Sequence, residues 1–389
     1  MDLSAFRHDD LVTSIEICAF CRRDAEAVDG FVAGHEAAMC NDCAAVLADE
    51  LADHQHAILR ERVRALPSPA RLHAWLDHRV VGQEQAKRVL AVQVHNHYKR
   101  LAWRGMHGTD AGPGKCNVLL SGPTGSGKTR LLESLARCLD VPFAAVDATT
   151  LTPSGHQGAG IESVIQALLR DCDWDPACAA RGIVYLDELD KLGGPDPDGR
   201  GAGVQQTLLQ CLEGRRVGVQ RPNGRWLSVS TRDVLFVGGG VFARDGRAAG
   251  GARPGEDDAR WLLRQGLIPE LVGRFPVHVP LDPPGIDVLR RLLTEPPDAP
   301  VRQMEALLAA DGCALQVSGA ALERMAGNAL RRGMGARGLF AEVEGVLRDA
   351  LFEVPGRADV ERVNVDVDGD KVAARLVPRR RVFADSSAA

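Results

Sequence analysis

The sequence predicts an α/β fold in which helices flank a mainly parallel sheet, with a small cysteine-rich module before the sheet and a smaller domain after it. Strand-like apolar runs alternate with helical stretches through the middle of the chain. A glycine-rich turn, GPTGSGKT at 122–129, follows the first of these strands, and two Cys-x-x-Cys pairs lie within the first 50 residues. Because alternating strands and helices require crossover connections, the strands should run parallel.

Length and composition leave room for two or three globular domains in 389 residues. The 47 basic and 52 acidic residues give a net charge of −5, so nucleic acid is not an expected partner. No apolar stretch is long enough for a membrane span, and the first residues do not resemble a secretion signal. Most of the ten cysteines are scattered through apolar segments, as in a reducing compartment. A soluble, cytoplasmic protein is expected.

Prolines interrupt the apolar patterns at Pro67 and again within 280–284, and these positions define the predicted domain boundaries. The predicted segments are a four-cysteine zinc-binding module at 1–50, a linker at 51–66, a large α/β domain at 67–282, a small domain at 283–378 and a flexible tail at 379–389.

Each element follows from its apolar spacing. Helical spacing is present at 51–66 and on both sides of a turn at 81–83. Apolar runs predict strands at 117–120, 141–146, 183–186 and 234–237, and helical spacing predicts helices at 129–139, 161–170 and 203–213. Surface loops are expected at 193–203 and 243–258, helices through 286–352, and a half-buried strand pair at 360–377.

The turn at 122–129 has the G-x-x-x-x-G-K-[ST] pattern between a buried strand and a helix, where phosphate binding requires it. Its glycines let backbone N–H groups face phosphate oxygens, and the helix N-terminus adds partial positive charge. Lys128 should reach the β- and γ-phosphates, and the Thr129 hydroxyl should bind Mg²⁺. ATP or GTP is expected to bind here, through Gly122, Pro123, Thr124, Gly125, Ser126, Gly127, Lys128, Thr129 and Arg130.

A second strand, within GIVYLDELDKL at 182–192, ends in two adjacent carboxylates. Asp187 should orient Mg²⁺ and its waters, and Glu188 should polarise the attacking water as general base. Asp190 and Lys191 are expected to be surface residues. The two motifs together predict hydrolysis of a nucleoside triphosphate, ATP or GTP.

Four cysteines have the spacing of a zinc site: Cys18 and Cys21 form one pair, and Cys40 and Cys43 form the other. The ion would supply folding free energy that so small a segment lacks. Four thiolates leave no position for water, so the zinc should be structural. Redox or disulfide use is the alternative, and His35 is expected to be a loop residue.

With these motifs in this order, the chain resembles the ClpX family, the AAA+ unfoldases that feed the ClpP peptidase, almost end to end. The resemblance rests on VVGQEQAKRVLAVQVHNHYKRL (80–101), GPTGSGKT, VPFAAVDATTLT (141–152), RGIVYLDELDKL (181–192), GVQQTLL (203–209), GLIPELVGRF (266–275) and GARGL (335–339). It implies an AAA+ P-loop ATPase domain, a small α-helical or α+β domain, and a homohexameric ring that threads proteins through a pore. The zinc module would bind substrates and adaptors.

The resemblance also assigns roles to residues outside the two motifs. The residues Val81, Gly82 and Gln83 match the turn beside the adenine. Arg274 matches the arginine finger that reaches a neighbouring subunit's site, and Arg337 matches the second-sensor arginine. A guanidinium can hold a fixed planar charge against the γ-phosphate. No first-sensor residue is assigned, because the strand at 234–237 runs into three glycines.

Three features depart from the family pattern. The substrate-gripping pore loop has histidine in place of the aromatic residue, in Gly155-His156-Gln157-Gly158. The peptidase-docking loop between Phe242 and Trp261 lacks its apolar Ile-Gly-Phe tip, and the basic recruiting loop is reduced to RRVGVQRPNGRW at 215–226. Weak or absent docking to a ClpP-type peptidase is therefore expected.

An ATP-driven unfoldase of the ClpX type is the leading functional hypothesis, and a peptidase-independent protein remodeller is the alternative. A non-catalytic, ATP-gated scaffold conflicts with the complete set of catalytic residues. A nucleic-acid motor conflicts with the absence of a basic groove.

Overall fold

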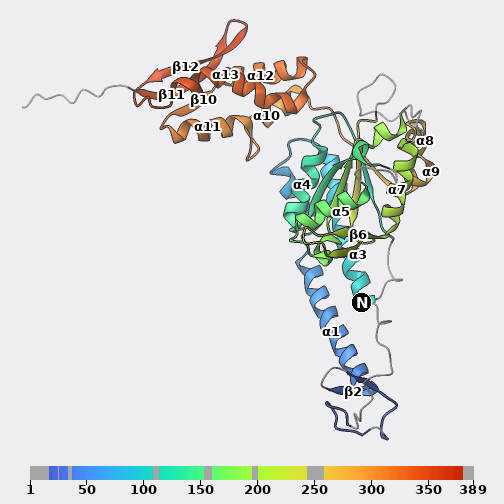
Figure 1. The fold of residues 1–389 in the computed structure, drawn as a ribbon. Coiled ribbons are helices and arrows are strands. Elements are labelled where there is room, and N and C mark those ends of the chain that lie inside the picture. Colours follow the sequence, from blue (N-terminus) through green and yellow to red (C-terminus); the bar gives the residue numbers. More distant parts are fainter. Residues whose placement is uncertain are drawn as a thin grey trace, which may run out of the picture. The chain divides into compact units, whose positions relative to one another are not determined.

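The computed structural model describes residues 17–24, 26–33, 37–107, 114–152, 160–194, 200–242 and 258–379 (Figure 1). The chain forms two compact units, one of residues 1–66 and 98–113 and the other of residues 67–97 and 114–389. The cysteine quartet lies in the first unit, and both nucleotide motifs lie in the second.

The first unit contains a short antiparallel hairpin, β1 (Phe31–Ala33) and β2 (Ala38–Cys40). A long helix, α1 (Asn41–Ala65), follows at once and runs past residue 50 without a break. Cys43 lies in its first turn. The helix expected from the charge spacing at 51–66 is therefore present, and its first turn carries one of the four cysteines.

Five parallel strands form the sheet of the second unit, in the order β4-β5-β8-β3-β9. They are β3 (Val118–Ser121), β4 (Phe143–Asp147), β5 (Ile183–Asp187), β8 (Leu235–Gly240) and β9 (Val277–Pro280). Every residue of β3 and β8 is buried, as in strands covered on both faces. The parallel sheet and four of its strands confirm the prediction.

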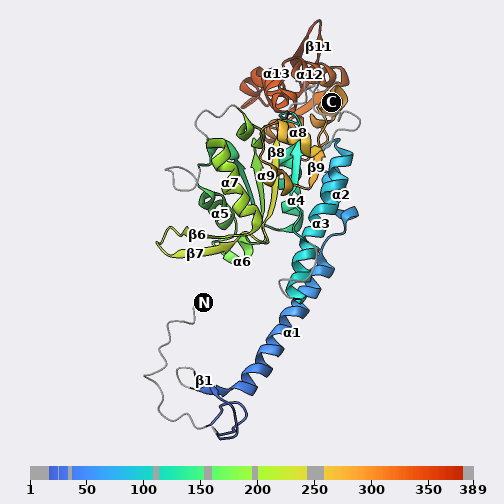
Figure 2. The same cartoon turned by 90° about the vertical axis from the view of Figure 1, so that its right-hand side faces the viewer.

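Helices lie on both sides of this sheet (Figure 2). They are α2 (Pro69–Asp77), α3 (Glu84–His107), α4 (Lys128–Leu139), α5 (Ile161–Arg170), α6 (Pro176–Ala179), α7 (Arg200–Glu213), α8 (Asp258–Arg264) and α9 (Pro269–Gly273). On α5 the buried residues recur three and four apart, which gives the helix one apolar face against the core. None of the helices in the described part of the chain has the length and apolar content needed to cross a bilayer.

Several elements differ from the predictions. The basic segment 215–226, expected as a loop, contributes to a hairpin of β6 (Arg216–Gln220) and β7 (Trp226–Ser230). Val217 and Val219, alternate residues of β6, are buried, which is the pattern of a half-buried strand. Helix α7 begins at Arg200, inside the expected loop at 193–203, and β9 was not expected.

The small domain combines helices with a three-stranded sheet. Its elements are α10 (Ile286–Leu292), α11 (Pro300–Ala310), β10 (Ala314–Val317), α12 (Gly319–Arg331), α13 (Leu339–Glu353), β11 (Val360–Asp368) and β12 (Lys371–Pro378). The antiparallel pair β11–β12 confirms the strands expected at 360–377. Strand β10 interrupts the stretch expected to be helical, because it pairs with β11, a partner distant in the sequence.

Buried Gln205 on α7 ties together three segments near the end of β5. Its Nε2 donates to the carbonyl oxygens of Leu192 and Gly266, both at 3.1 Å, and its Oε1 accepts from the N–H of Ile268 at 2.8 Å. These bonds hold the segment after Asp187 against the loop that leads into α9.

Gln205→Leu should strongly destabilise the domain, because it removes three hydrogen bonds made by a buried side chain and leaves the backbone groups of Leu192, Gly266 and Ile268 without this partner. We expect a loss of about 3 kcal/mol and a melting temperature lower by roughly 5–10 °C. The matched control is Gln206→Leu, since Gln206 is the exposed neighbour. Equal melting temperatures for the two variants would contradict the structural role of Gln205.

Candidate functional site

The phosphate loop, residues 122–129, connects the carboxyl end of β3 to α4. Gly125 and Gly127 have φ angles of 80° and 98°, a left-handed region that favours glycine. The N–H of Gly122 donates to the carbonyl oxygen of Gly240, at the end of β8, over 3.1 Å. Gly127 is the N-cap of α4 and offers no side chain to its first N–H groups, which suits them to an anion.

Lys128 is buried at the centre of this loop. Its Nζ donates to the carbonyl oxygens of Gly122 at 2.7 Å and Pro123 at 3.2 Å. Burial lowers the pKa of Lys128, and the charge of Arg337 lowers it further, against the opposing effect of Asp187. The ammonium group is thus held by neutral carbonyls, which a phosphate can replace.

The two residues predicted to bind Mg²⁺, Thr129 and Asp187, are both neighbours of Tyr185. Asp187, the last residue of β5, accepts hydrogen bonds at Oδ1 from the Tyr185 hydroxyl and from the N–H of Glu188, both at 2.9 Å. The side chain of Thr129 is near enough to the Tyr185 hydroxyl to affect its pKa. Thr129 and Asp187 are therefore both neighbours of the same phenol group.

Glu188, the predicted general base, has a φ of 60°, which is uncommon for a residue with a side chain. Its Oε2 forms an ion pair with Lys191 Nζ at 2.6 Å. Asp190 is half-buried, and a Cβ at Gly240 would overlap its carboxylate. Lys191 is exposed, as expected, but it is also a partner of the catalytic candidate. The expectation that Asp190 is a surface residue was wrong, because the turn after β5 folds it back against β8.

The turn predicted to lie beside the adenine packs against the phosphate loop. Gln83 Nε2 donates to the carbonyl oxygens of Ser126 at 3.3 Å and Asp282 at 2.8 Å, and its Oε1 accepts from the N–H of Asp282. Val81 is buried, and Gly82 has a φ of 71°. Gln83 thus joins the turn, the phosphate loop and the segment that leads into the small domain.

The segment with the second-sensor candidate also reaches the phosphate loop. Arg337 belongs to a short 3-10 helix, η4 (Gly335–Gly338). A Cβ placed on Gly125 would lie 3.5 Å from the backbone nitrogen of Ala336 and 3.9 Å from that of Arg337. The segment of Arg337 thus lies beside the phosphate loop, which explains why the charge of Arg337 lowers the pKa of Lys128.

Arg130, predicted among the nucleotide contacts, has other partners here. Its Nε donates to the carbonyl oxygen of Arg79 at 3.2 Å, and its guanidinium forms a bidentate ion pair with Asp298. This pair lowers the pKa of Asp298. The contacts of Arg130 therefore connect α4 to the small domain.

Arg274 lies near the amino-terminal ends of the strands, whereas Lys128 lies near their carboxyl-terminal ends. The carbonyl oxygen of Arg274 accepts from Asn117 Nδ2 at 3.0 Å, and Asn117 precedes β3, whereas the phosphate loop follows β3. Its half-exposed guanidinium pairs with Glu213 at the end of α7. The chain therefore does not bring Arg274 to its own phosphate loop.

A nucleotide phosphate group with Mg²⁺ fits the residues around the phosphate loop. Ser126 Oγ is buried and has no hydrogen-bond partner among the described residues, so it is available to a phosphate oxygen. Lys128 and the loop N–H groups would hold the phosphates, and Thr129 and Asp187 would hold the ion, which would neutralise charge on the phosphate oxygens.

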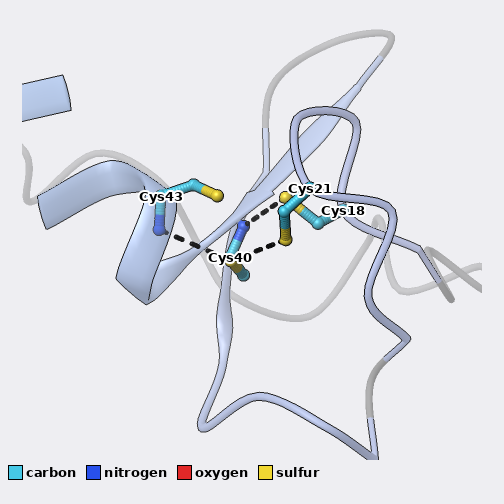
Figure 3. A group of neighbouring side chains, drawn as sticks. All are labelled: Cys18, Cys21, Cys40 and Cys43. Carbon is cyan, nitrogen blue, oxygen red and sulfur yellow. Dashed lines mark hydrogen bonds between the residues drawn. The ribbon is translucent and has the colours of Figure 1, made fainter. Parts of the chain in front are cut away.

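The four cysteines converge on one point in the first unit (Figure 3). Their Sγ atoms lie within 4.8 Å of one another, and Cys21 Sγ and Cys40 Sγ are 3.7 Å apart. A tetrahedron of sulfurs around zinc, with bonds of about 2.3 Å, has edges of roughly 3.8 Å. The backbone N–H groups of Cys40 and Cys43 donate to the sulfurs of Cys18 and Cys40.

The charges in this cluster also fit a cation. Backbone N–H groups lower the pKa of Cys18 to about 6, whereas proton sharing with Cys40 and Cys21 raises the pKa of Cys43 to about 12. So many thiols cannot all ionise in this space without a cation. The cluster can therefore hold zinc, with the sulfurs of Cys18, Cys21, Cys40 and Cys43 as ligands.

Sequence reasoning missed Arg23 as a neighbour of the sulfurs. Its guanidinium donates to Cys21 Sγ at 3.3 Å and to Cys40 Sγ at 3.8 Å, and it pairs with Asp42 at 2.9 Å. A cation that donates to thiolates offsets the negative charge of a four-thiolate site. The only sequence signal was a basic residue beside the first cysteine pair.

Some predicted features lie outside the described residues. They are the pore loop Gly155-His156-Gln157-Gly158, His35, and most of the segment between Phe242 and Trp261. The ends of that segment are described, and the rings of Phe242 and Trp261 pack with centroids 5.8 Å apart. The reduced basic loop is also described, and in it the side chain of Trp226 is 71% exposed.

Comparison with known families agrees with this geometry. Residues 114–278 match the family model described as AAA domain (Cdc48 subfamily). The matched segment contains the phosphate loop, Asp187, Glu188 and Arg274. Residues 114–278 therefore carry an AAA-type ATPase domain, and the match supports an ATP-dependent AAA+ protein that uses nucleotide and Mg²⁺.

Proposed function

We propose that this protein is an ATP-dependent protein unfoldase of the ClpX type. Six copies form a ring in the cytoplasm and pull protein substrates through its pore, and the zinc module recruits substrates and adaptors. The observation that carries the proposal is the meeting of three separate segments at the phosphate loop: the turn at Gln83, the end of β5 with Asp187, and the segment of Arg337. This arrangement supports coupling between hydrolysis and movement of the small domain.

The position of Arg274 supports a site shared between subunits. Its backbone lies at the amino-terminal edge of β3, away from the phosphate loop of its own chain, and its guanidinium is half-exposed. A side chain in that position can serve a neighbouring copy, where its charge would stabilise the transition state.

A peptidase-independent remodeller is the second candidate. It is favoured by the segment between Phe242 and Trp261, which lacks an apolar tip and whose ends pack together through their rings. A peptidase pocket that needs an apolar anchor would gain little affinity from such a loop.

The proposal is tested with a tagged, stably folded fluorescent protein as substrate, with ATP and with or without the host's peptidase. Glu188→Gln should bind ATP normally but lose turnover by a factor of about 10²–10⁴, because an amide is not a base. It should also fail to unfold the substrate.

The matched control is Glu162→Gln, which changes an exposed acid on α5. Unfolding without degradation would select the remodeller. Continued hydrolysis by Glu188→Gln would remove Glu188 from its role, and hydrolysis without any unfolding would contradict the unfoldase.

A further inference from the structure

The central strand β8 presents no side chain to the nucleotide site where it ends. It lies between β5 and β3, and its last residues are Gly238-Gly239-Gly240. Its end borders the phosphate loop, since the carbonyl oxygen of Gly240 accepts from the N–H of Gly122. Any polar group needed at this edge must therefore come from another element.

Tyr185 of β5 fills the space beside Gly239. The tyrosine is fully buried, and a Cβ at Gly239 would overlap its hydroxyl and ring carbons. Residues two apart on a strand share a face, so Tyr185 and Asp187 point the same way. The glycine on β8 thus makes room for a phenol that reaches Asp187.

The phenol contacts the carboxylate on one oxygen only. Asp187 Oδ1 accepts from both the Tyr185 hydroxyl and the N–H of Glu188. Among the described residues, no donor is found at Oδ2. Two donors on the same oxygen fix the rotation of the carboxylate and leave the other oxygen for a cation.

We infer that Tyr185 is a positioning residue for Mg²⁺–nucleotide: from the space beside Gly239 it orients the Asp187 carboxylate toward the ion. The inference rests on the nucleotide- and Mg²⁺-binding part of the proposed function. The Tyr185 hydroxyl is the donor in this contact, since its oxygen lies 2.9 Å from Asp187 Oδ1.

Tyr185→Phe in the full chain tests the inference, because it removes the hydroxyl and keeps the ring. Half-maximal ATP hydrolysis and half-maximal binding of a fluorescent ADP should require roughly 10-fold more Mg²⁺. ADP binding in EDTA, which does not depend on the ion, should stay close to that of the unaltered protein.

Tyr98→Phe is the matched control, because Tyr98 is the other of two tyrosines in the sequence and is also buried. A Mg²⁺ requirement of Tyr185→Phe equal to that of Tyr98→Phe would overturn the inference, even if the melting temperature falls. Failure of the unaltered chain to bind ADP with Mg²⁺ would overturn the ATPase function as well.

A second measurement needs no substitution at Tyr185. The chain is labelled with 3-fluorotyrosine, and Tyr98→Phe assigns the two fluorine resonances. The Tyr185 resonance should shift when Mg²⁺ is added to the ADP complex, whereas the Tyr98 resonance should not. A Tyr185 resonance that ignores Mg²⁺ would overturn the inference even if Tyr185→Phe does not fold.

Discussion

Arg274→Ala is expected to lower ATP turnover by about 10³-fold or more while each chain still binds nucleotide. The reason is that Arg274 lies near the amino-terminal end of β3 and Lys128 follows its carboxyl-terminal end, so in the proposed ring Arg274 would serve the site of a neighbouring copy. The ion pair with Glu213 is half-exposed, so its loss should barely change stability. Hydrolysis of ATP and binding of a fluorescent nucleotide measure the two effects.

Mixing two inactive variants gives a sharper test. Lys128→Ala lacks the phosphate-loop lysine but keeps Arg274, and Arg274→Ala keeps Lys128. When equal amounts of the two variants mix at random in a ring, about a quarter of the sites contain both residues. ATP turnover should therefore recover to about a quarter of that of the unaltered protein. Arg170→Ala, which changes an exposed arginine at the end of α5, is the control. No recovery on mixing, or full activity of Arg274→Ala alone, would refute the shared site.

Removal of zinc is expected to unfold the cysteine module and to leave the nucleotide site intact. The free energy at stake is about 10 kcal/mol or more, since a structural four-ligand zinc site supplies most of the folding energy of so small a module. Chelator or Cys21→Ser should make residues 17–43 sensitive to protease. Metal analysis measures the loss of zinc, limited proteolysis measures unfolding of the cysteine module, and binding of a fluorescent nucleotide shows whether the nucleotide site stays intact.

Cys138→Ser is the control for zinc removal, because Cys138 lies on α4, outside the quartet. It should keep the full zinc content. Full zinc content in Cys21→Ser would exclude Cys21 as a ligand, and loss of nucleotide binding on chelation would contradict the independence of the two units.

Much of the candidate site was predictable because its information is local in the sequence. The left-handed angles at Gly125 and Gly127 and the burial of Lys128 belong to one short loop. The quartet was predictable for a similar reason. Only two residues separate the cysteines of each pair, and the two pairs come together at one point that can hold an ion. The order of strand and helix likewise predicted a parallel sheet.

Other features depended on partners distant in the sequence. Strand β10 forms by pairing with β11, and Arg130 turns to Asp298 in the small domain. The apolar pattern of β10 and the position of Arg130 beside the phosphate loop contained no sign of these partners. Such contacts follow from tertiary packing, which can override local propensity.

The sequence by itself determined the chemistry of this protein: a phosphate loop, a pair of carboxylates after a buried strand, and four thiols at metal-binding spacing. Only the tertiary structure decided how those groups are supported, with Tyr185 in the space left by Gly239 and Lys191 paired with Glu188. The physical reason is that the backbone conformation of a few consecutive residues positions the motif residues. Their supporting contacts depend instead on which strands and turns the fold brings side by side.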